Sequence, residues 1–309
     1  MDLPPLVDRA QLRAAGYSDR ELRRLLRCGE LTPIRRGSYL RGAPPDEAPA
    51  RHALAARAAV ARLAPGAVCS HVTAAVLHGL PVWQVPLERV HVTRAPNGSG
   101  SRTNARVHVH VARLRDDEIS VVAGIPVTSV ARTVLDVART VPFEAAVVVA
   151  DAALRRRGPM PSRAAVDRAA LSDVLADADG WPGIRAARRV IAFADGGSDS
   201  VGESRSRVAL DQAGLPKPIL QWKATDRGGE LIGYTDFGWP QLRTVGEFDG
   251  QVNYGRLLRP GQEPGDVVFA EKLREDRLRD QGLSVVRWTW SDLTRFAPVA
   301  DRLRRRFGR

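Results

Sequence analysis

The chain has 309 residues, more than a peptide hormone or a single small module, and enough for two or three domains with hydrophobic cores. Its formal net charge of +12 points to a polyanionic partner, and to nucleic acid first. The charge is +4, +5 and +3 over residues 1–45, 46–195 and 196–309, so the total does not locate a binding surface.

The composition also indicates a compartment. Cys28 and Cys69 have no CxxC spacing, so neither a disulfide framework nor a cysteine zinc site is supported. The first residues lack the basic start and apolar run of a signal peptide, and the most apolar stretch, near 145–154, is too short to span a membrane. We therefore expect a soluble, cytoplasmic protein with no membrane partner.

Two helix-start signals follow one another near the N-terminus. Asp8 and Gln11 have the spacing of a capping box, in which each side chain accepts a hydrogen bond from the backbone N–H of the other residue. Ser18 and Glu21 repeat this spacing at the start of a second helix that runs to about Arg27. Two short helices across a tight turn predict a helix–turn–helix.

The second of these helices has two different faces. Leucines at helical spacing lie on one face, at Leu22, Leu25 and Leu26. Arginines line the other face, at Arg20, Arg23, Arg24 and Arg27. The leucines can pack against a core while the arginines point outward.

Residues 31–40 predict two short strands joined by a basic turn, as in the wing that follows a recognition helix. Arg35 and Arg36 in this turn would reach phosphates or the minor groove of double-stranded DNA. Because helix, wing and charge agree, we predict a winged helix–turn–helix DNA-binding domain over residues 1–45. The competing interpretation is a solvated basic helix face in a chain that is rich in arginine throughout.

Residues 46–195 predict a central α+β domain. Apolar periodicity predicts helices near 48–63, 70–78, 129–140, 143–156 and 184–194. Alternation of period two predicts strands near 90–93 and 107–111, joined as a hairpin by residues 95–101. P-loop, GxGxxG and GxSxG motifs are absent from the sequence, which gives no support to nucleotide hydrolysis, Rossmann redox chemistry or α/β-hydrolase activity.

The histidines are confined to this central region, at positions 52, 71, 78, 91, 108 and 110. None has the HExxH spacing of a zinc protease. His108 and His110 share one face of a predicted strand and could touch one ligand. The alternative interpretation is a partly exposed strand pair without a ligand.

Three segments carry a resemblance to a known family. The order RAQLRAAGYSDRELRRLLRCGELTPIRRGSYL resembles the winged-helix N-terminus of AbiEi-type antitoxins from type IV toxin–antitoxin systems. GAVCSHVTAAVLHGLPV (66–82) and GIPVTSVARTVLDVA (124–138) are similar to central segments of that family. The resemblance covers roughly the first 155 residues. It implies a DNA-binding regulator of its own operon, paired functionally with a toxin without direct contact.

Residues 196–309 predict helix, three strands, helix, strand and helix. Asp236 and Glu247 end the second and third strands, and Glu203 opens the helix that precedes the strands. Two acids at equivalent strand ends repel one another and resist burial unless a cation joins them. The spacing therefore predicts a Mg²⁺ site formed by Asp236 and Glu247. The alternative is that these acids bind no metal and occur at these positions only because strand ends are commonly polar.

The segments around these acids resemble the very-short-patch-repair-like group of PD-(D/E)XK endonuclease domains. They are GESRSRVAL, GYTDFGWP, VGEFDGQVNYG and EKLREDRLRDQGLSVVRWTW, within about 200–293. The resemblance implies site residues at Glu203, Asp236, Glu247 and Asp249. Asp249 stands where the family has a lysine. Lys272 or Arg277 on the following helix could supply the cation, and Lys272, the lysine of that region, is preferred for orienting water or stabilising charge.

Together these patterns predict an α+β or α/β multidomain protein: a winged helix–turn–helix over 1–45, an α+β domain over 46–195 and a restriction-endonuclease-like αβββαβ domain over 196–309. The predicted function is a DNA-binding, antitoxin-like transcriptional regulator with a nuclease-like domain. The alternative is a Mg²⁺-dependent DNA endonuclease targeted by the winged helix. A third possibility is that the last domain keeps the fold as a binding or dimerisation module.

Overall fold

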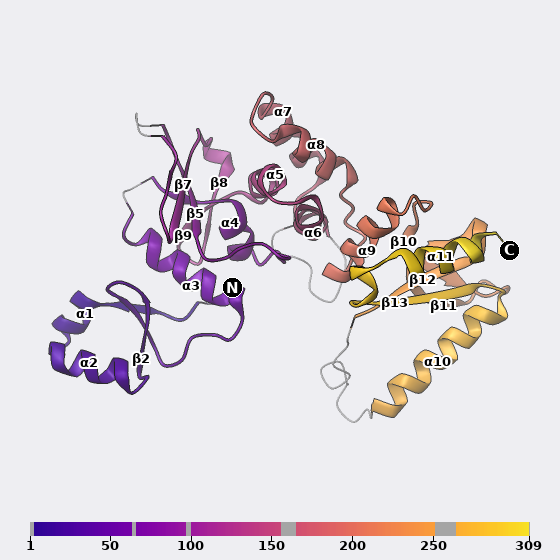
Figure 1. The fold of residues 1–309 in the computed structure, drawn as a ribbon, viewed down its shortest axis with the longest axis horizontal. Coiled ribbons are helices and arrows are strands. Elements are labelled where there is room, and N and C mark those ends of the chain that lie inside the picture. The colour runs from indigo at the N-terminus through magenta and orange to yellow at the C-terminus, as the bar shows by residue number, and fades with distance from the viewer. Residues whose placement is uncertain (1–2, 64–65, 97–99, 156–164, 251–263, 309) are drawn as a thin grey trace. The chain divides into compact units, whose positions relative to one another are not determined.

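Three β-sheets with helices packed on them make up this computed structural model, which describes all residues except 1–2, 64–65, 97–99, 156–164, 251–263 and 309 (Figure 1). The chain mixes α and β structure and divides into two compact units, Met1–Ala194 and Asp195–Arg309, called here the N-terminal unit and the C-terminal unit. Among the helices described, none has the length and apolar character needed to cross a membrane.

The N-terminal unit begins with a small antiparallel sheet. Its strand order is β1 (Leu6–Asp8), β3 (Ser38–Arg41), β2 (Leu31–Arg35), and helices α1 (Arg9–Ala14) and α2 (Asp19–Arg27) stand between β1 and β2 in the sequence. Both predicted capping boxes are confirmed. Asp8 Oδ1 accepts from Gln11 N at 2.7 Å, and Ser18 N donates to Glu21 Oε2 at 2.8 Å.

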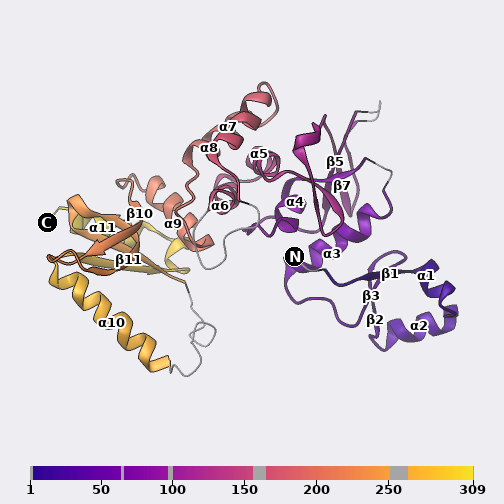
Figure 2. The same ribbon diagram turned by 180° about the vertical axis from the view of Figure 1, so that it is seen from behind.

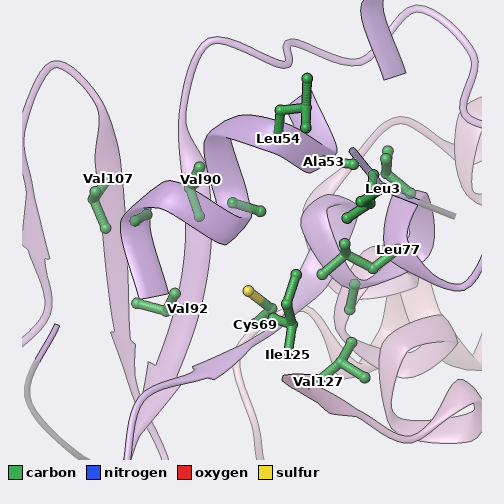
Figure 3. Close-up of a cluster of buried hydrophobic side chains, with 14 of the residues drawn as sticks. Leu3, Ala53, Leu54, Cys69, Leu77, Val90, Val92, Val107, Ile125 and Val127 are labelled. Atoms are coloured by element: carbon green, nitrogen blue, oxygen red, sulfur yellow. The ribbon is translucent and has the colours of Figure 1, made fainter. Parts of the chain in front are cut away.

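Leucines anchor the two short helices to this sheet. A small core is formed by Leu12, Leu22, Leu25 and Leu31. A second, larger core contains Leu3 and Leu40 together with buried residues of the central region, such as Leu54 and Leu77 (Figure 3). The residues on both sides of the expected boundary at 45/46 therefore share one core, and the division of this unit into two domains stays a prediction.

The central region is built on a six-stranded mixed sheet. Its order is β6 (Arg102–Thr103), β7 (Val107–Val111), β5 (Val90–Arg94), β4 (Val68–Cys69), β9 (Ile125–Thr128), β8 (Ile119–Val122). The predicted hairpin between β5 and β7 is wrong, because these strands pair in parallel. The short strand β6 pairs antiparallel with β7 instead, and Asn104 Oδ1 accepts from the backbone N–H groups of Arg106 and Val107 at the turn.

The described residues of this region also form six helices. They are α3 (Ala48–Val60), α4 (His71–Leu77), α5 (Val130–Thr140), α6 (Phe143–Leu154), α7 (Arg168–Asp177) and α8 (Ile184–Phe193). Five lie where apolar periodicity predicts them. Helix α7 was not predicted; it follows the cap residue Asp167, whose side chain accepts from Ala170 N at 2.8 Å.

A buried ion network fixes α5. The Arg132 side chain is only 1% exposed, and its Nη1 lies 2.9 Å from Glu118 Oε1 while its Nε lies 3.2 Å from Asp136 Oδ1. Arg139 reaches Asp136 as well, at 3.4 Å. The guanidinium groups of both arginines stack over Trp181, at 4.7 and 4.9 Å from its ring. Each buried charge in this network therefore has a partner of opposite sign.

The C-terminal unit has the element order that the sequence predicts. A sheet of order β10 (Ile219–Thr225), β11 (Leu231–Trp239), β12 (Thr244–Asp249), β13 (Ser284–Thr289) is antiparallel except for the parallel pair β12–β13. Figure 1 and Figure 2 show α10 (Pro264–Asp280) along one face, and α9 (Val201–Gln212) and α11 (Ala297–Phe307) on the other.

One glycine sets how closely α9 approaches the sheet. A Cβ at Gly202 would lie 1.9 Å from the Phe248 ring, so only glycine permits this contact between α9 and β12. The next residue is Glu203, which is therefore held against the sheet near Asp236 and Glu247.

Candidate functional site

Four arginines on α2 form an open basic surface, which we call the α2 face. Arg20, Arg23, Arg24 and Arg27 are all exposed. Within the described part of the chain none of them has a salt bridge, whereas the nearby Arg9 and Arg13 both pair with Asp19. Of the leucines on the opposite face, Leu22 and Leu25 are buried and Leu26 is half-buried, in line with the two-faced sequence pattern. The α2 face therefore presents four guanidinium groups that an external anion can contact.

The basic turn, residues 35–38, connects β2 to β3. Arg36 is exposed, but Arg35 is half-buried, and burial followed by the charges of Arg106 and Arg62 lowers its pKa. The Arg35 Nη1 atom is buried with no hydrogen-bond partner among the described residues. A cationic group with an unused donor, crowded by like charge, is well suited to accept an anion.

The basic turn is fixed at two points. The Arg36 carbonyl accepts from Arg62 Nη1 of the segment after α3 at 3.2 Å, and the Gly37 carbonyl accepts from the backbone N–H of Arg9 at 3.2 Å. Gly37 has φ +77, a left-handed conformation that glycine adopts without strain. The turn therefore keeps a defined position beside α1.

The C-terminal unit brings three of the predicted acids together. Asp236 lies on β11, Glu247 on β12 and Glu203 on the first turn of α9, and the charges of both glutamates act on Asp236. The described pairing of β11 with β12 stops at Phe237 and Gly246. Beyond that point Asp236 Oδ2 accepts from the backbone N–H of Phe248 at 2.8 Å.

The pKa values of Asp236 and Glu203 are raised. Burial, and then the charges of Glu203 and Glu247, raise the pKa of Asp236 to about 7. Burial also raises the pKa of Glu203, against hydrogen bonds from Asp199 N and the Ser200 hydroxyl. Both carboxyl groups are thus held in surroundings that disfavour their charge.

Arginines, rather than Lys272, neutralise Glu247. Arg274 Nη2 on α10 lies 2.6 Å from Glu247 Oε1, and Arg287 Nη2 on β13 lies 2.9 Å from Glu247 Oε2. Both arginines also pair with Glu271. Sequence reasoning missed them, although Arg287 stands directly beside Glu247 in the parallel register of β12 and β13, where opposite charges are favoured.

Gln221 is a second residue that the sequence did not reveal. Its Nε2 donates to Glu203 Oε2 at 3.1 Å, from the middle of β10. Its backbone has φ +47, a strained conformation for a residue with a side chain. Strain of this kind clusters at functional sites, but no local sequence signal predicts it for a glutamine within a strand.

The remaining predicted residues of this site lie outside the acidic group. Asp249 and Lys272 are exposed. Arg277 is exposed and lies 3.8 Å from Asp226 and 3.7 Å from Glu230.

As it stands, the acidic group does not fit a Mg²⁺ site. Both oxygens of Glu247 contact guanidinium groups, and across the described residues these acids do not bring three ligand atoms within 4.8 Å of one another. Magnesium binding would require Arg274 and Arg287 to release Glu247.

Four histidines gather on one face of the central sheet, in what we call the histidine cluster. It comprises His71, His91, His108 and His110. The valines that alternate with them, such as Val90, Val92 and Val107, point into the core on the opposite face (Figure 3). The other two histidines have structural hydrogen bonds: His52 to Leu87 O and Thr73 Oγ1, and His78 to Thr128 O.

Comparison with known proteins supports the interpretation of the N-terminus. Residues 2–42 match a family described as a transcriptional regulator, AbiEi antitoxin. Two curated relatives from Mycobacterium tuberculosis, uncharacterized proteins MT2308 and Rv2248, are each 32% identical over 174 residues, which is 56% of this chain. The chain spans 58% of the length of these relatives.

A solved structure, the RV2827C protein from Mycobacterium tuberculosis, is 18% identical with a TM-score of 0.40, over 70% of this chain and 78% of that one.

Proposed function

We propose that the chain is a sequence-specific, DNA-binding transcriptional regulator of antitoxin type. The α2 face carries this proposal, because its exposed arginines lie inside the segment that matches the AbiEi antitoxin family. In the proposed complex Arg23, Arg24 and Arg27 approach bases and phosphates of the major groove. Arg35 and Arg36 of the basic turn act as a wing on the backbone or in the minor groove.

The proposal is tested by footprinting and titration on the DNA upstream of the chain's own gene. Substituting Arg23, Arg24 and Arg27 together by alanine should weaken binding by about 100-fold or more, since one bidentate base contact alone contributes about 1–3 kcal/mol. It should also reduce the salt dependence, by about one unit of slope for each phosphate that the variant no longer neutralises.

A matched control removes the same charge elsewhere. Arg185, Arg305 and Arg306 are exposed arginines on α8 and α11, and their triple alanine variant should retain the footprint. If the α2 variant binds the operator as well as the wild type does, or if both variants lose affinity equally, α2 is not the recognition helix.

The same proposal includes a functional pairing with a toxin that needs no direct contact. The partner to test is a toxin-like nucleotidyltransferase encoded next to the gene. Cells whose growth is arrested by this toxin should grow again when the chain is co-expressed, while the two proteins should not co-purify. If growth stays arrested when the chain and the toxin are expressed at matched levels, the functional pairing is contradicted. Co-purification would instead replace the indirect pairing with a complex.

A second candidate function is a Mg²⁺-dependent DNA endonuclease. One observation favours it: the buried Glu203 and Glu247 lie together with the half-buried Asp236, and Glu203 accepts a hydrogen bond from Gln221, whose backbone is strained. This candidate requires Arg274 and Arg287 to release Glu247 when Mg²⁺ binds. With Mg²⁺ or Mn²⁺ the protein should then cut DNA, and Asp236→Ala should abolish cutting. Asp276→Ala, an exposed aspartate on α10, is the matched control and should cut normally.

Calorimetry separates this candidate from a binding or dimerisation module. An endonuclease should bind Mg²⁺ with a heat that Glu247→Ala removes. Absence of both cutting and this heat would assign the C-terminal unit to binding or dimerisation instead.

A further inference from the structure

The histidine cluster is assembled from parts of the chain that are distant in sequence. His71 is the first residue of α4, His91 lies on β5, and His110 lies on β7. One ring nitrogen from each of these three lies within 4.8 Å of the other two, and His91 Nδ1 is 3.0 Å from His110 Nε2. His108 stacks on His110, with ring centroids 4.0 Å apart.

The distances suit a shared metal ion. Zinc–nitrogen bonds are about 2.0–2.1 Å long, so two imidazole nitrogens on one tetrahedral zinc lie about 3.3 Å apart. The separation between His91 and His110 is already close to this value. Since His71 stacks on His110 at 3.7 Å between centroids, its ring must rotate to direct a nitrogen to the same point.

The backbone and hydrogen bonds around His71 hold it in place. Its φ of +53 is strained for a residue with a side chain. Its Nδ1 lies 3.0 Å from Ser70 Oγ, which in turn accepts from Thr93 Oγ1 at 2.8 Å. Such a contact on one ring nitrogen, which fixes the ring and leaves Nε2 available, is typical of histidines that bind metals.

The surroundings select the kind of ion. The cluster lines a cavity of about 310 Å³, which gives a ligand room, and Glu88 lines it outside the group of three. Arg89 and Arg139 add positive charge near the rings. A hard cation such as Mg²⁺ or Ca²⁺ needs oxygen ligands and negative charge, whereas imidazole nitrogens suit Zn²⁺, Ni²⁺ or Cu²⁺.

We propose that His71, His91 and His110 form a binding site for a divalent transition metal of the Zn²⁺ class, with His108 stacked behind them as support. The three imidazoles supply nitrogen ligands, and the cavity leaves a further position for water or a small ligand. Nothing in the proposed DNA recognition requires this ion, so the two proposals stand or fall separately.

The site is tested on the full chain with any histidine tag removed. Zn²⁺ titrated by calorimetry should bind at about one ion per chain, Co²⁺ should give visible absorption bands of nitrogen coordination, and Mg²⁺ should not bind here. His91→Ala should weaken Zn²⁺ binding by about 100-fold or more. Ser70→Ala, which removes a supporting hydrogen bond, should weaken it by about 10–100-fold.

His78→Gln is the matched control, because His78 lies outside the cluster, and it should bind Zn²⁺ as the wild type does. His110→Gln, which keeps a polar side chain, replaces His91→Ala if circular dichroism shows that the alanine variant is unfolded. A wild-type chain that binds no Zn²⁺, or a folded His91 or His110 variant with unchanged stoichiometry and affinity, overturns the proposal.

Discussion

Arginine has opposite roles on the α2 face and around Glu247. On α2 the guanidinium groups are exposed and have no salt bridge to any described residue. Around Glu247, Arg274 and Arg287 contact carboxylates, and the buried Arg132 in the N-terminal unit pairs with Glu118 and Asp136. The same residue type therefore provides a contact surface in one place and internal charge balance in another.

This difference separates function from stability. An exposed arginine contributes little to folding, so its loss should be visible mainly in the proposed DNA binding. A buried arginine stabilises the acids beside it, and its removal leaves uncompensated charge inside the protein. Neither helical spacing nor net charge distinguishes the two roles, because partners are set by the tertiary fold.

The largest effect is expected at Arg132. Arg132→Ala leaves Glu118 and Asp136 buried without their main partner and should lower the free energy of unfolding by about 3–5 kcal/mol, measured by chemical denaturation. The exposed Arg185→Ala on α8 is the control and should change it by less than about 0.5 kcal/mol. If Arg132→Ala and Arg185→Ala unfold at the same denaturant concentration, the contrast between buried and exposed arginines does not hold.

The next effect concerns pH. Because the pKa of Asp236 rises from 3.8 to about 7 on folding, the folded state binds more protons between these values, so stability should fall as pH rises from about 4 to about 7. Glu203 contributes with the same sign. Asp236→Asn should flatten this slope and be more stable than the wild type at pH 8, by a few kcal/mol at most. Parallel pH profiles for the two proteins would contradict the burial of this charge.

Removing Arg274 should have a smaller effect. Glu247 keeps Arg287 as a partner, so Arg274→Ala should cost about 1–3 kcal/mol, the contribution of hydrogen bonds to charged groups. Because Arg274 also lowers the pKa of Asp236, its loss should move the pH transition of stability upward. An unchanged transition would mean that Arg287 alone balances the group.

The smallest effect is expected on α2. Substituting Arg23, Arg24 and Arg27 together by alanine should change the free energy of unfolding by no more than about 0.5 kcal/mol per residue, despite the loss of DNA binding. Ser18→Ala, which removes the helix cap, should cost about 1 kcal/mol in the same denaturation experiment. A large loss of stability in the triple variant would show that these arginines are structural.

Local patterns in the sequence predicted much of the fold. The Asp8 and Ser18 capping boxes formed as expected because capping depends on residues only three positions apart. The alternation around His91 and His108 predicted β5 and β7 correctly as strands. The approach of Asp236, Glu247 and Glu203 was also predicted, since it follows from the order of elements in the C-terminal unit.

Non-local features were not predictable in the same way. The parallel pairing of β5 with β7 was missed because the segment between them contains β6, a strand of only two residues with no pattern of its own. Arg274 and Gln221 reach their acids through helix placement and an unusual backbone angle, which propensities do not encode. The histidine cluster was seen in part, at His108 and His110, while His71 and His91 joined it through the tertiary fold.

In the proposed DNA complex, the two hydrogen bonds that fix the basic turn have a consequence for the shape of the DNA. Because Arg62 and the start of α1 hold the turn, the turn and α1 form one stiff block that loses little conformational entropy on association. A stiff binding surface cannot adapt to a groove of the wrong width, so the duplex must supply the deformation. Sequence selectivity would then extend to base pairs that no side chain touches.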